Sequence, residues 1–283
     1  MTATDSSTAL DNLAVDTIRT LSMDAVQKAN SGHPGTPMAL APLAYVLYTR
    51  VMRHNPRGPD WPDRDRFVLS AGHASMLLYS TLYLSGYAVS LEDDIEQFRQ
   101  LGSRAAGHPE YHDLPGIEVT TGPLGQGISH SVGLALAERM LAARFNRDGH
   151  DVVDHHTFVI ASDGDLEEGI SGEASSLAGH LQLGRLISFY DQNHISIEGD
   201  TALAFSEDVG KRYEAYGWHV QDLREDIALD RLERALRDAM AVEDKPSMII
   251  VRTHIAQGSP NKHDTAGAHG SPLGEDAWKA EGG

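Results

Sequence analysis

The sequence predicts an α/β fold in which helices cover both faces of a parallel β-sheet. Four short apolar, β-branched or aromatic runs are continuous rather than alternating, which is typical of strands buried on both faces. Helical stretches separate these runs, and such alternation implies parallel strands joined by crossover helices. The expected strands are Arg66–Ser70, Thr157–Ala161, Leu186–Tyr190 and Met248–Arg252.

Two of the expected helices are amphipathic. One runs from about Asp11 to Asn30, and the other covers residues 229–240. Each has apolar residues at helical spacing, which indicates one buried face. These residues are Leu13, Ile18, Leu21 and Ala25 in the first helix, and Leu229, Leu232, Leu236 and Met240 in the second.

A third expected helix, Gly127–Leu141, is rich in small residues and carries no charge before Glu138. Small side chains allow another backbone to approach closely. The sequence leaves two interpretations open for this segment. It is either a central core helix that is buried on most sides, or a helix at a subunit interface.

Three long loops are rich in glycine, proline and histidine, over residues 53–65, 102–125 and 257–274. Long loops inside a compact domain usually carry function. The chain shows no repeat, no low-complexity segment and no clear interdomain linker. We therefore expect one domain over residues 11–275, with flexible termini at residues 1–10 and 276–283.

Composition excludes several classes of function. The 283 residues include 23 basic and 41 acidic side chains, which gives a formal net charge of −18. This charge disfavours binding to nucleic acids or to anionic membrane surfaces, and the apolar runs are too short to span a bilayer. The absence of cysteine excludes disulfides, thiolate metal sites and cysteine nucleophiles. Because the first residues lack the layout of a signal peptide, we expect a cytoplasmic protein.

Polar residues follow two expected strands at the edge where parallel sheets bind ligands. Asp163 follows one strand, and Asn193 follows the next strand thirty residues later. Their side-chain oxygens and the Ile195 carbonyl form a set of hard ligands for Mg²⁺, or alternatively Ca²⁺ or Mn²⁺. Gly164 lets the backbone approach a phosphate group closely. Taken alone, an Asp-Gly pair is more often an ordinary strand-to-helix turn.

The strand-end Asp-Gly, the spacing near thirty and the Asn followed by Ile-Ser-Ile together resemble the thiamine-diphosphate fingerprint, with Ser162 in place of the usual first glycine. Further segments resemble transketolase and occur in that family's order. They are Ser31–Gly35, Arg64–His73, Phe98–Arg104, Gly107–Glu110, Thr120–Gly127, Glu168–Ser175 and His269–Leu273. On these motifs the chain is identified as a member of the transketolase family, with the thiamine-diphosphate-binding fold of the diphosphate type.

The resemblance implies a thiamine-diphosphate-dependent transferase and gives roles to particular residues. Histidine titrates near neutral pH and can move protons to and from sugar hydroxyls. The expected catalytic residues are His33, His73, His108 and His269. Those expected to bind the cofactor are His73, Gly122, Pro123, Leu124, Gly164, Glu168, Asn193 and His269, and the expected metal ligands are Asp163, Asn193 and Ile195. Glu168 and Glu173 are expected to join a carboxylate network between two cofactor sites of a dimer.

The resemblance extends to the first of three transketolase domains only. The carboxylate that activates the cofactor belongs to the family's pyrimidine-binding domain, so we expect a partner chain that carries this domain. Together they would transfer a two-carbon ketol group from a ketose (phosphate) donor to an aldose (phosphate) acceptor through thiamine diphosphate. We expect the N-terminal subunit of a split transketolase rather than an excised fragment. The expected assembly is a heterotetramer, α2β2, with the helix 127–141 near its twofold axis. On this expectation Ala135→Trp should block assembly rather than chemistry.

The sequence leaves one other function open and disfavours two. A two-component ketolase of specialised metabolism, with a non-standard donor or acceptor, stays open. A non-catalytic paralogue is disfavoured because the ligand residues and the loop histidines are present, and the α-subunit of a 2-oxoacid dehydrogenase is disfavoured by the Gly-His-Pro-Gly and Leu-Ser-Ala-Gly-His loops. The remaining histidines, including His155, His156 and His180, are expected to be structural or surface residues.

Overall fold

The computed structural model describes residues 3–197 and 199–275, and its centre is a five-stranded sheet. The strands are β1 (Arg66–Leu69), β2 (Thr157–Ser162), β3 (Leu186–Gln192), β4 (His219–Asp222) and β5 (Ser247–Arg252). Their order across the sheet is β1-β2-β3-β5-β4, and every neighbouring pair is parallel. The predicted α/β fold with a parallel sheet is therefore confirmed.

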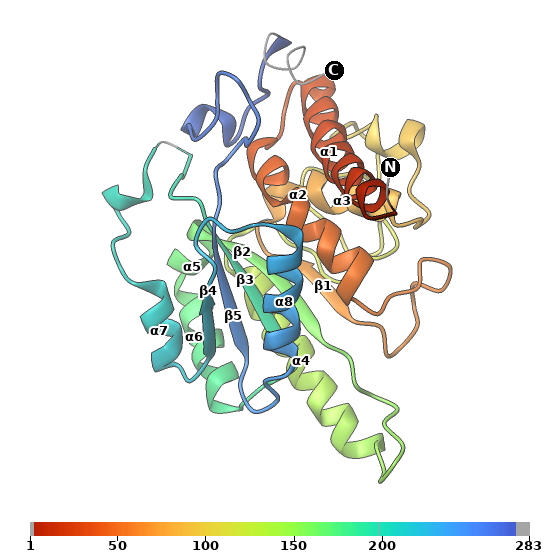
Figure 1. Ribbon diagram of the computed structural model, residues 1–283, viewed down its shortest axis with the longest axis vertical. Helices are drawn as coiled ribbons and strands as arrows, with labels where there is room; N and C mark the ends of the chain where they lie inside the picture. Colours follow the sequence, from red (N-terminus) through yellow and green to blue (C-terminus); the bar gives the residue numbers. More distant parts are fainter. Residues whose placement is uncertain (1–2, 198, 276–283) are drawn as a thin grey trace.

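Helices cover both faces of this sheet (Figure 1). One face carries α1 (Ala3–Ala29), α2 (Gly35–Val46), α3 (Ser75–Leu84) and α8 (Leu229–Met240), and the other carries α4 (Gln126–Phe145), α5 (Asp163–Glu167), α6 (Gly169–His180) and α7 (Val209–Ala215). Successive side chains of β2 point to opposite faces of the sheet. Ile160 packs against the first group of helices and Ala161 against the second. None of the described helices is both long enough and apolar enough to cross a bilayer.

Short helical turns complete the described chain. They are Leu47–Val51, Gly72–Ala74, Leu91–Ile95, Thr201–Leu203 and Ala266–Ala268. The three long loops predicted from composition contain no α-helix and no β-strand. Two of them, over residues 102–125 and 257–274, reach the carboxyl edge of the sheet, where they supply walls of the candidate site described below.

Several elements differ from the sequence expectation. The first helix begins at Ala3 rather than near residue 11, so part of the segment expected to be a flexible N-terminus is helical. Residues 3–10 contain no glycine or proline that would end a helix there. The C-terminal residues expected to be flexible, 276–283, lie outside the described residues.

The elements that were not predicted include β4, α2, α3 and α7. The edge strand β4 has the sequence His-Val-Gln-Asp and is only half-buried, so it shows no apolar run. Helices α2 and α3 are buried on nearly all sides, which removes the polar face that marks an amphipathic helix. Because these helices lack a stripe, periodicity does not reveal them.

The small-residue helix α4 packs closely on the end of β1. A Cβ atom on Gly127 would lie 2.4 Å from the Cα atom of Ser70, so only glycine fits at this crossing. Ile128, Val132 and Ala135 point into the core, whereas the opposite side of the helix is exposed. Of the two interpretations of this helix, that of a core helix buried on most sides is therefore wrong, because the sheet covers only one of its faces.

We expect replacement of the two glycines of α4 by alanine to change the free energy of unfolding in opposite directions. Gly127→Ala forces a Cβ atom against the backbone of β1 and should lower the free energy of unfolding by about 1–3 kcal/mol. Gly133→Ala, where an added Cβ meets nothing within 4 Å, should raise it by about 0.5–1 kcal/mol through helix propensity. Urea unfolding of both variants measures the contrast. Equal effects would mean that the crossing tolerates a side chain.

Candidate active site

The register of the sheet brings the ends of β2 and β3 together. Ser162 of β2 lies beside Asp191 of β3, and the residues that follow each strand therefore meet at the carboxyl edge. The backbone N–H of Asn193 donates to Oδ2 of Asp163 at 3.2 Å. The predicted neighbourhood of Asp163 and Asn193 is thus present in the structure.

Asp163 is a buried carboxylate held by three donors. Its Oδ1 accepts the hydroxyl proton of Tyr190 at 2.5 Å, and its Oδ2 accepts the N–H groups of Asn193 and His194, the latter at 3.0 Å. Burial raises the pKa of Asp163, while these hydrogen bonds act in the opposite direction. Among the described residues, no basic side chain lies within ion-pair distance of it.

A second buried carboxylate orients the side chain of Asn193. The Asn193 Nδ2 group donates to Asp191 Oδ2 at 3.0 Å, and the Asn193 Oδ1 atom accepts the Ile195 N–H at 2.9 Å. Thr253 Oγ1 donates to the other Asp191 oxygen. Complete burial raises the pKa of Asp191 to about 7. Because the nitrogen of the Asn193 amide is held by Asp191, its oxygen is the group that faces a cation, with the lone pair that the Ile195 N–H does not use.

Four histidines from distant parts of the chain gather beside this edge. His33 lies between α1 and α2, His73 on the turn after β1, His108 in the loop before α4, and His269 after the last short turn. The ring centroids of His33 and His73 are 4.9 Å apart, those of His73 and His269 are 5.1 Å apart, and those of His33 and His269 are 5.5 Å apart. His108 packs on Gly122, where a Cβ atom would lie 3.3 Å from its ring.

Burial and neighbouring positive charge keep these histidines neutral. Burial lowers the pKa of His33 to about 4, with further lowering from His269 and Arg99. Burial also lowers the pKa values of His108 and His269, and it places that of His73 well below its usual range. At neutral pH the four rings are therefore proton acceptors as well as hydrogen-bond donors.

The histidines and the strand-end residues line one cavity of about 430 Å³. The predicted residues on its wall are His33, His73, His108, Gly122, Leu124, Asp163, Gly164, Asn193, Ile195 and His269. A Cβ atom on Gly164 would lie 3.0 Å from Leu124 Cδ1, so this glycine keeps the wall open beside Asp163. The structure thus brings together most of the residues that the sequence pointed to.

Three predicted residues do not line the cavity. Pro123 and Glu168 are exposed and are not among its lining residues, and Glu173 is exposed on α6. Glu167 lines the cavity instead. The one-residue difference arises because α5 ends at Glu167 and the chain turns into an extended conformation at Glu168 before α6 starts.

The histidines assigned no function lie elsewhere. His155 and His156 precede β2, at the opposite end of that strand from Asp163. The His155 ring contacts Asp63 at 3.2 Å, and the backbone N–H of His156 donates to Asp65 at 2.7 Å. His180 is exposed at the end of α6.

Sequence reasoning missed Asp165, which organises the site without lining it. Its buried carboxylate accepts hydrogen bonds from Ser70 Oγ (2.8 Å), Gly125 N–H (2.9 Å) and Ser162 N–H (3.0 Å). The Ser162 hydroxyl also donates to it. Ser162 and Asp165 form a capping box at the start of α5, in which each side chain accepts the backbone N–H of the other residue. The spacing Ser-x-x-Asp after a strand was the signal that could have revealed this residue.

Arg99 is a second residue that the candidate set lacked. Its guanidinium donates to Ser31 Oγ at 2.7 Å, and one of its nitrogens lies 3.5 Å from His33 Nδ1. The segment Phe98–Arg104 carried part of the family resemblance, but residue type alone did not distinguish Arg99 from Arg104. Arg104 instead pairs with Asp94 at 2.6 Å, away from the histidines.

Comparison with known protein families finds one match over nearly the whole chain. The model of the family described as "Transketolase, thiamine diphosphate binding domain" matches residues 10–281. The transketolase of Halalkalibacterium halodurans is 57% identical over 270 residues, which are 95% of this chain and 40% of that protein. The chloroplastic transketolase of Zea mays is 58% identical over 262 residues, or 92% of this chain and 39% of that protein.

Solved structures agree with this match. A transketolase of Pichia stipitis in complex with sedoheptulose 7-phosphate superimposes with a TM-score of 0.93 at 50% identity, covering 96% of this chain and 40% of that one. The transketolase of Leishmania mexicana gives the same values. The chain therefore spans about 40% of the length of the relatives that it matches.

Because the pKa of His33 is lowered on folding, we expect the free energy of unfolding to depend on pH in the acid range. Between pH 6.5 and about pH 4 the unfolded chain binds a proton at His33 that the folded chain excludes, so the free energy of unfolding falls as the pH falls through this window. His33→Gln removes this term, and its stability should decline less than that of the wild type. Urea unfolding at pH 8, 6.5, 5.5 and 4.5 measures both slopes, and the value at pH 8 gives the cost of altered packing. Parallel curves would contradict the assignment.

Proposed function

The chain belongs to the transketolase family, and we propose that it forms the diphosphate-binding part of an enzyme that transfers a two-carbon ketol group from a ketose phosphate to an aldose phosphate. The observation that supports this proposal most directly is the single cavity shared by four neutral histidines and the strand-end pair Asp163 and Asn193. The matched domain is a thiamine diphosphate-binding domain.

The cavity suits a diphosphate-bearing cofactor in its shape and in its polar groups. Gly122 and Gly164 lack side chains that would narrow it, and His269 Nδ1 is buried with no hydrogen-bond partner among the described residues. A buried polar atom without a partner is costly, so a bound group that reaches it is favoured. When bound, thiamine diphosphate supplies an electron-accepting thiazolium to the reacting sugar.

We assign the metal that accompanies the diphosphate to Asp163, Asn193 and the Ile195 carbonyl. Oxygen donors of this kind suit Mg²⁺, with Ca²⁺ or Mn²⁺ as alternatives. Within the described part of the chain no three His, Cys, Asp or Glu side chains could hold a metal together, so phosphate oxygens and water must complete the shell. Two buried carboxylates, Asp163 and Asp191, lie at this edge, and no cationic side chain of the described residues is within ion-pair distance of either, which favours a cation there.

The histidines act on the sugar. Their lowered pKa values leave imidazole nitrogens that can accept a proton from a sugar hydroxyl and return it to the product. Arg99 beside His33 opposes protonation of the resting ring and offers a positive group to an anionic substrate. The half-buried position of the rings keeps them accessible from the cavity while limiting water around them.

The remaining part of the active site is proposed to come from a partner polypeptide that carries a pyrimidine-binding domain. The chain spans about 40% of its relatives, so the other 60% of their length has no counterpart in it. We propose an α2β2 assembly in which Glu168 and Glu173, both exposed, face the twofold axis and join the two cofactor sites. Their exposure in the single chain is compatible with burial in such an interface.

The exposed side of α4 is the proposed twofold contact. Gln126, His130, Gly133, Ala137 and Met140 recur every three or four residues along it, and none is Asp, Glu, Lys or Arg. The adjacent helix α6 exposes apolar side chains on the same face of the sheet, namely Ile170 and Leu177. An exposed face that lacks charged side chains and carries Met140, Ile170 and Leu177 is typical of an interface.

Ala135 does not belong to this surface. It is 1% exposed and packs against Val132 in the chain's own core, so a bulky residue there would damage the fold. The sequence-based choice of Ala135 as an interface probe was therefore wrong, because periodicity alone did not show which side of α4 faces the sheet. Ala137, which is exposed, is the suitable position on α4 for testing the interface.

The metal assignment is tested with Asp163→Asn, which keeps the shape of the side chain and removes its charge. We expect the affinity for thiamine diphosphate in the presence of Mg²⁺ to fall by more than about 100-fold, beyond the about 10–100-fold lost with outer partners of a metal site. Isothermal titration calorimetry measures it, and Asp208→Asn at the exposed N-cap of α7 is the matched control. Unchanged Mg²⁺-dependent affinity in Asp163→Asn would contradict the assignment.

The role of the histidines is tested by activity. The partner can be the part of the H. halodurans transketolase that lies beyond the matched 40%. In the reconstituted enzyme we expect His73→Asn to lower kcat for ketol transfer by about 10²–10⁴-fold, the usual contribution of a general acid or base, while its Tm changes little. His150→Asn, at an exposed position, should retain activity. A His73 variant with lost stability but normal turnover per folded molecule would assign a structural role.

Assembly is tested by placing a charge on α4. Ala137→Glu buries a carboxylate in the proposed twofold contact and should shift the complex from α2β2 toward single αβ pairs, with lower activity. Ala143→Glu makes the same change on another exposed side of the helix and should leave the mass unaltered. Light scattering during titration with the partner measures both. An unchanged mass for Ala137→Glu would exclude α4 from the interface.

A further inference from the structure

A second cavity, of about 470 Å³, lies at the amino edge of the sheet, at the opposite end of the strands from the histidine cavity. Its wall is formed by the second half of α4 and by three segments that each lead into a strand. These segments are residues 146–154 before β2, 182–185 before β3 and 243–244 before β5. The residues described as lining the two cavities do not overlap, so this hollow is separate from the candidate active site.

Glu138 of α4 supplies a buried carboxylate that has no partner. The residue is 5% exposed and lines the cavity. Among the described residues, no group forms a hydrogen bond or an ion pair with its carboxylate. Burial raises the pKa of Glu138 to about 7, although Arg185 acts in the opposite direction. A buried carboxylate without a partner is costly, so a cation that enters the cavity and reaches Glu138 would be bound favourably.

The arginines that line the cavity are held by other groups. Arg185 pairs with Asp154, and the Arg139 guanidinium donates to the carbonyl oxygen of Leu181. Neither of these two described arginines lies within ion-pair distance of Glu138. Negative charge is therefore in excess in this cavity, and a ligand that complements it must carry positive charge.

The remaining lining suits an alkyl chain with a second positive charge. Ala135 and Leu183 are buried apolar residues on the wall. The exposed rim carries three carboxylates that form no ion pair with any described residue, namely Asp151, Glu243 and Asp244. The cavity thus combines an inner carboxylate, an apolar wall and outer carboxylates. An alkyl diammonium ion has the matching groups.

A metal ion suits the cavity less well than an organic cation. Mg²⁺ and Ca²⁺ take six or more oxygen ligands in a compact shell. Within the described part of the chain, no three His, Cys, Asp or Glu side chains are placed to hold one metal ion together. The carboxylates of the cavity are therefore too dispersed for a metal, whereas an elongated ligand can reach more than one of them.

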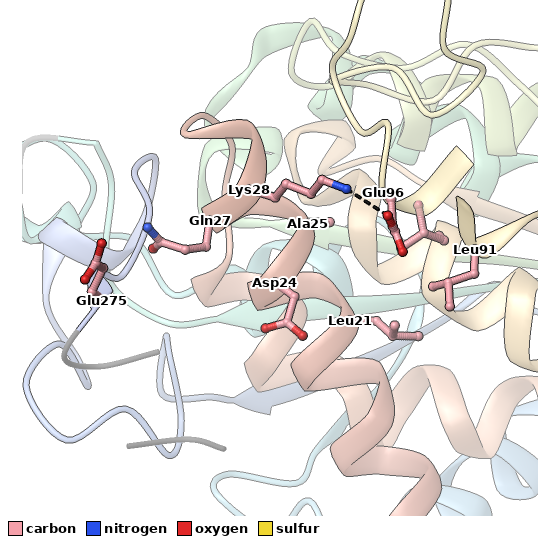
Figure 2. Close-up of a pocket in the computed structure, with 9 residues that line it drawn as sticks. Leu21, Asp24, Ala25, Gln27, Lys28, Leu91, Glu96 and Glu275 are labelled. Atoms are coloured by element: carbon pink, nitrogen blue, oxygen red, sulfur yellow. Dashed lines mark hydrogen bonds and ion pairs between the residues drawn. The ribbon is translucent and has the colours of Figure 1, made fainter. Parts of the chain in front are cut away.

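Another hollow outside the active site lacks an unpartnered charge. A groove of about 710 Å³ between α1 and residues 91–96 contains the ion pair of Lys28 and Glu96, which is 2.8 Å long and drawn as a dashed line in Figure 2. Asp24 and Glu275, which also line this groove, have interaction partners as well. The free carboxylate of Glu138 therefore distinguishes the cavity at the amino edge.

We propose that the cavity at the amino edge binds a short alkyl diamine in its diammonium form. One ammonium group pairs with Glu138, the alkyl chain lies along the apolar wall, and the other ammonium group pairs with the carboxylates of the rim. An ammonium group donates up to three hydrogen bonds, so it can satisfy both oxygens of the buried carboxylate. This inference does not depend on the proposed enzymatic function.

Isothermal titration calorimetry with 1,4-diaminobutane tests the proposal on the chain at pH 8, where Glu138 is ionised and both amines are protonated. Sodium chloride at 150 mM screens the general attraction of cations to a chain of net charge −18. We expect saturable binding of one diamine per chain. 1-Aminobutane, which lacks the second ammonium group, should bind at least about tenfold more weakly.

Glu138→Gln keeps the shape of the side chain and removes its charge, and it should weaken diamine binding at least about tenfold. Because the unpartnered carboxylate opposes folding, the same variant should not lower the free energy of unfolding in urea. A loss of binding with intact stability therefore separates ligand binding from a structural role. Glu214→Gln, at an exposed position of α7, is the matched control and should bind the diamine as the wild type does.

Ala142→Leu gives an independent reading without a change of charge. Ala142 is half-buried and lines the cavity, so a larger side chain there narrows the cavity and should weaken diamine binding at least about threefold. Ala143→Leu makes the same change at the next residue, which is exposed and is not among the described lining residues. This control should leave the affinity unaltered.

Several results would overturn the proposal. They are an absence of saturable diamine binding, wild-type affinity in Glu138→Gln or Ala142→Leu, and binding of 1-aminobutane as tight as that of the diamine. Titration with MgCl₂ adds one more, because saturable Mg²⁺ binding that Glu138→Gln abolishes would assign the cavity to a metal ion instead. If Glu138→Gln does not fold by circular dichroism, Ala142→Leu and the 1-aminobutane titration decide the outcome.

Discussion

Four hydrogen bonds converge on the buried carboxylate of Asp165, and they join segments that are far apart in the chain. Ser70 comes from the end of β1, Gly125 from the turn before α4, and Ser162 from the end of β2. A buried charge without such partners would be strongly destabilising, so the carboxylate holds the three segments in a single arrangement. This arrangement also fixes the position of Asp163, two residues earlier, and that of the glycine-rich segment that precedes α4 and lines the cavity.

The candidate site has two electrostatic halves. At the strand ends, Asp163 and Asp191 are carboxylates whose charge is opposed by burial and supported by hydrogen bonds. A short distance along the same cavity, the histidines are neutral because burial and Arg99 oppose their protonation. One end thus favours a cation, and the other presents neutral hydrogen-bond donors and acceptors. The separation follows from topology, since strands supply the acids and loops supply the histidines.

The sequence predicted the sheet and most of the site because both depend on local signals. Apolar runs marked four strands, and residues just beyond two of them marked the carboxyl edge. Periodicity failed for α2 and α3, which are buried all round, and for the half-buried strand β4. The sequence also did not show which side of α4 packs on the sheet, because two sides of this helix have similar composition. Ala135 was for this reason expected at the interface, whereas it lies in the core. The sequence also did not show that Glu167 rather than Glu168 lines the cavity, since the end of α5 at Glu167 is decided by a turn rather than by a residue type.

The walls of the histidine cavity come from both ends of the described chain, with His33 near its start and His269 near its close. No contiguous fragment of the domain contains the site, and its contacts are among those of longest sequence separation. Closing such long loops is entropically costly and slow. During synthesis, a chain that already carries His33 and Asp163 still lacks the last wall until the residues around His269 have emerged from the ribosome. A cofactor that contacts all of these walls would therefore stabilise the complete domain rather than a fragment of it.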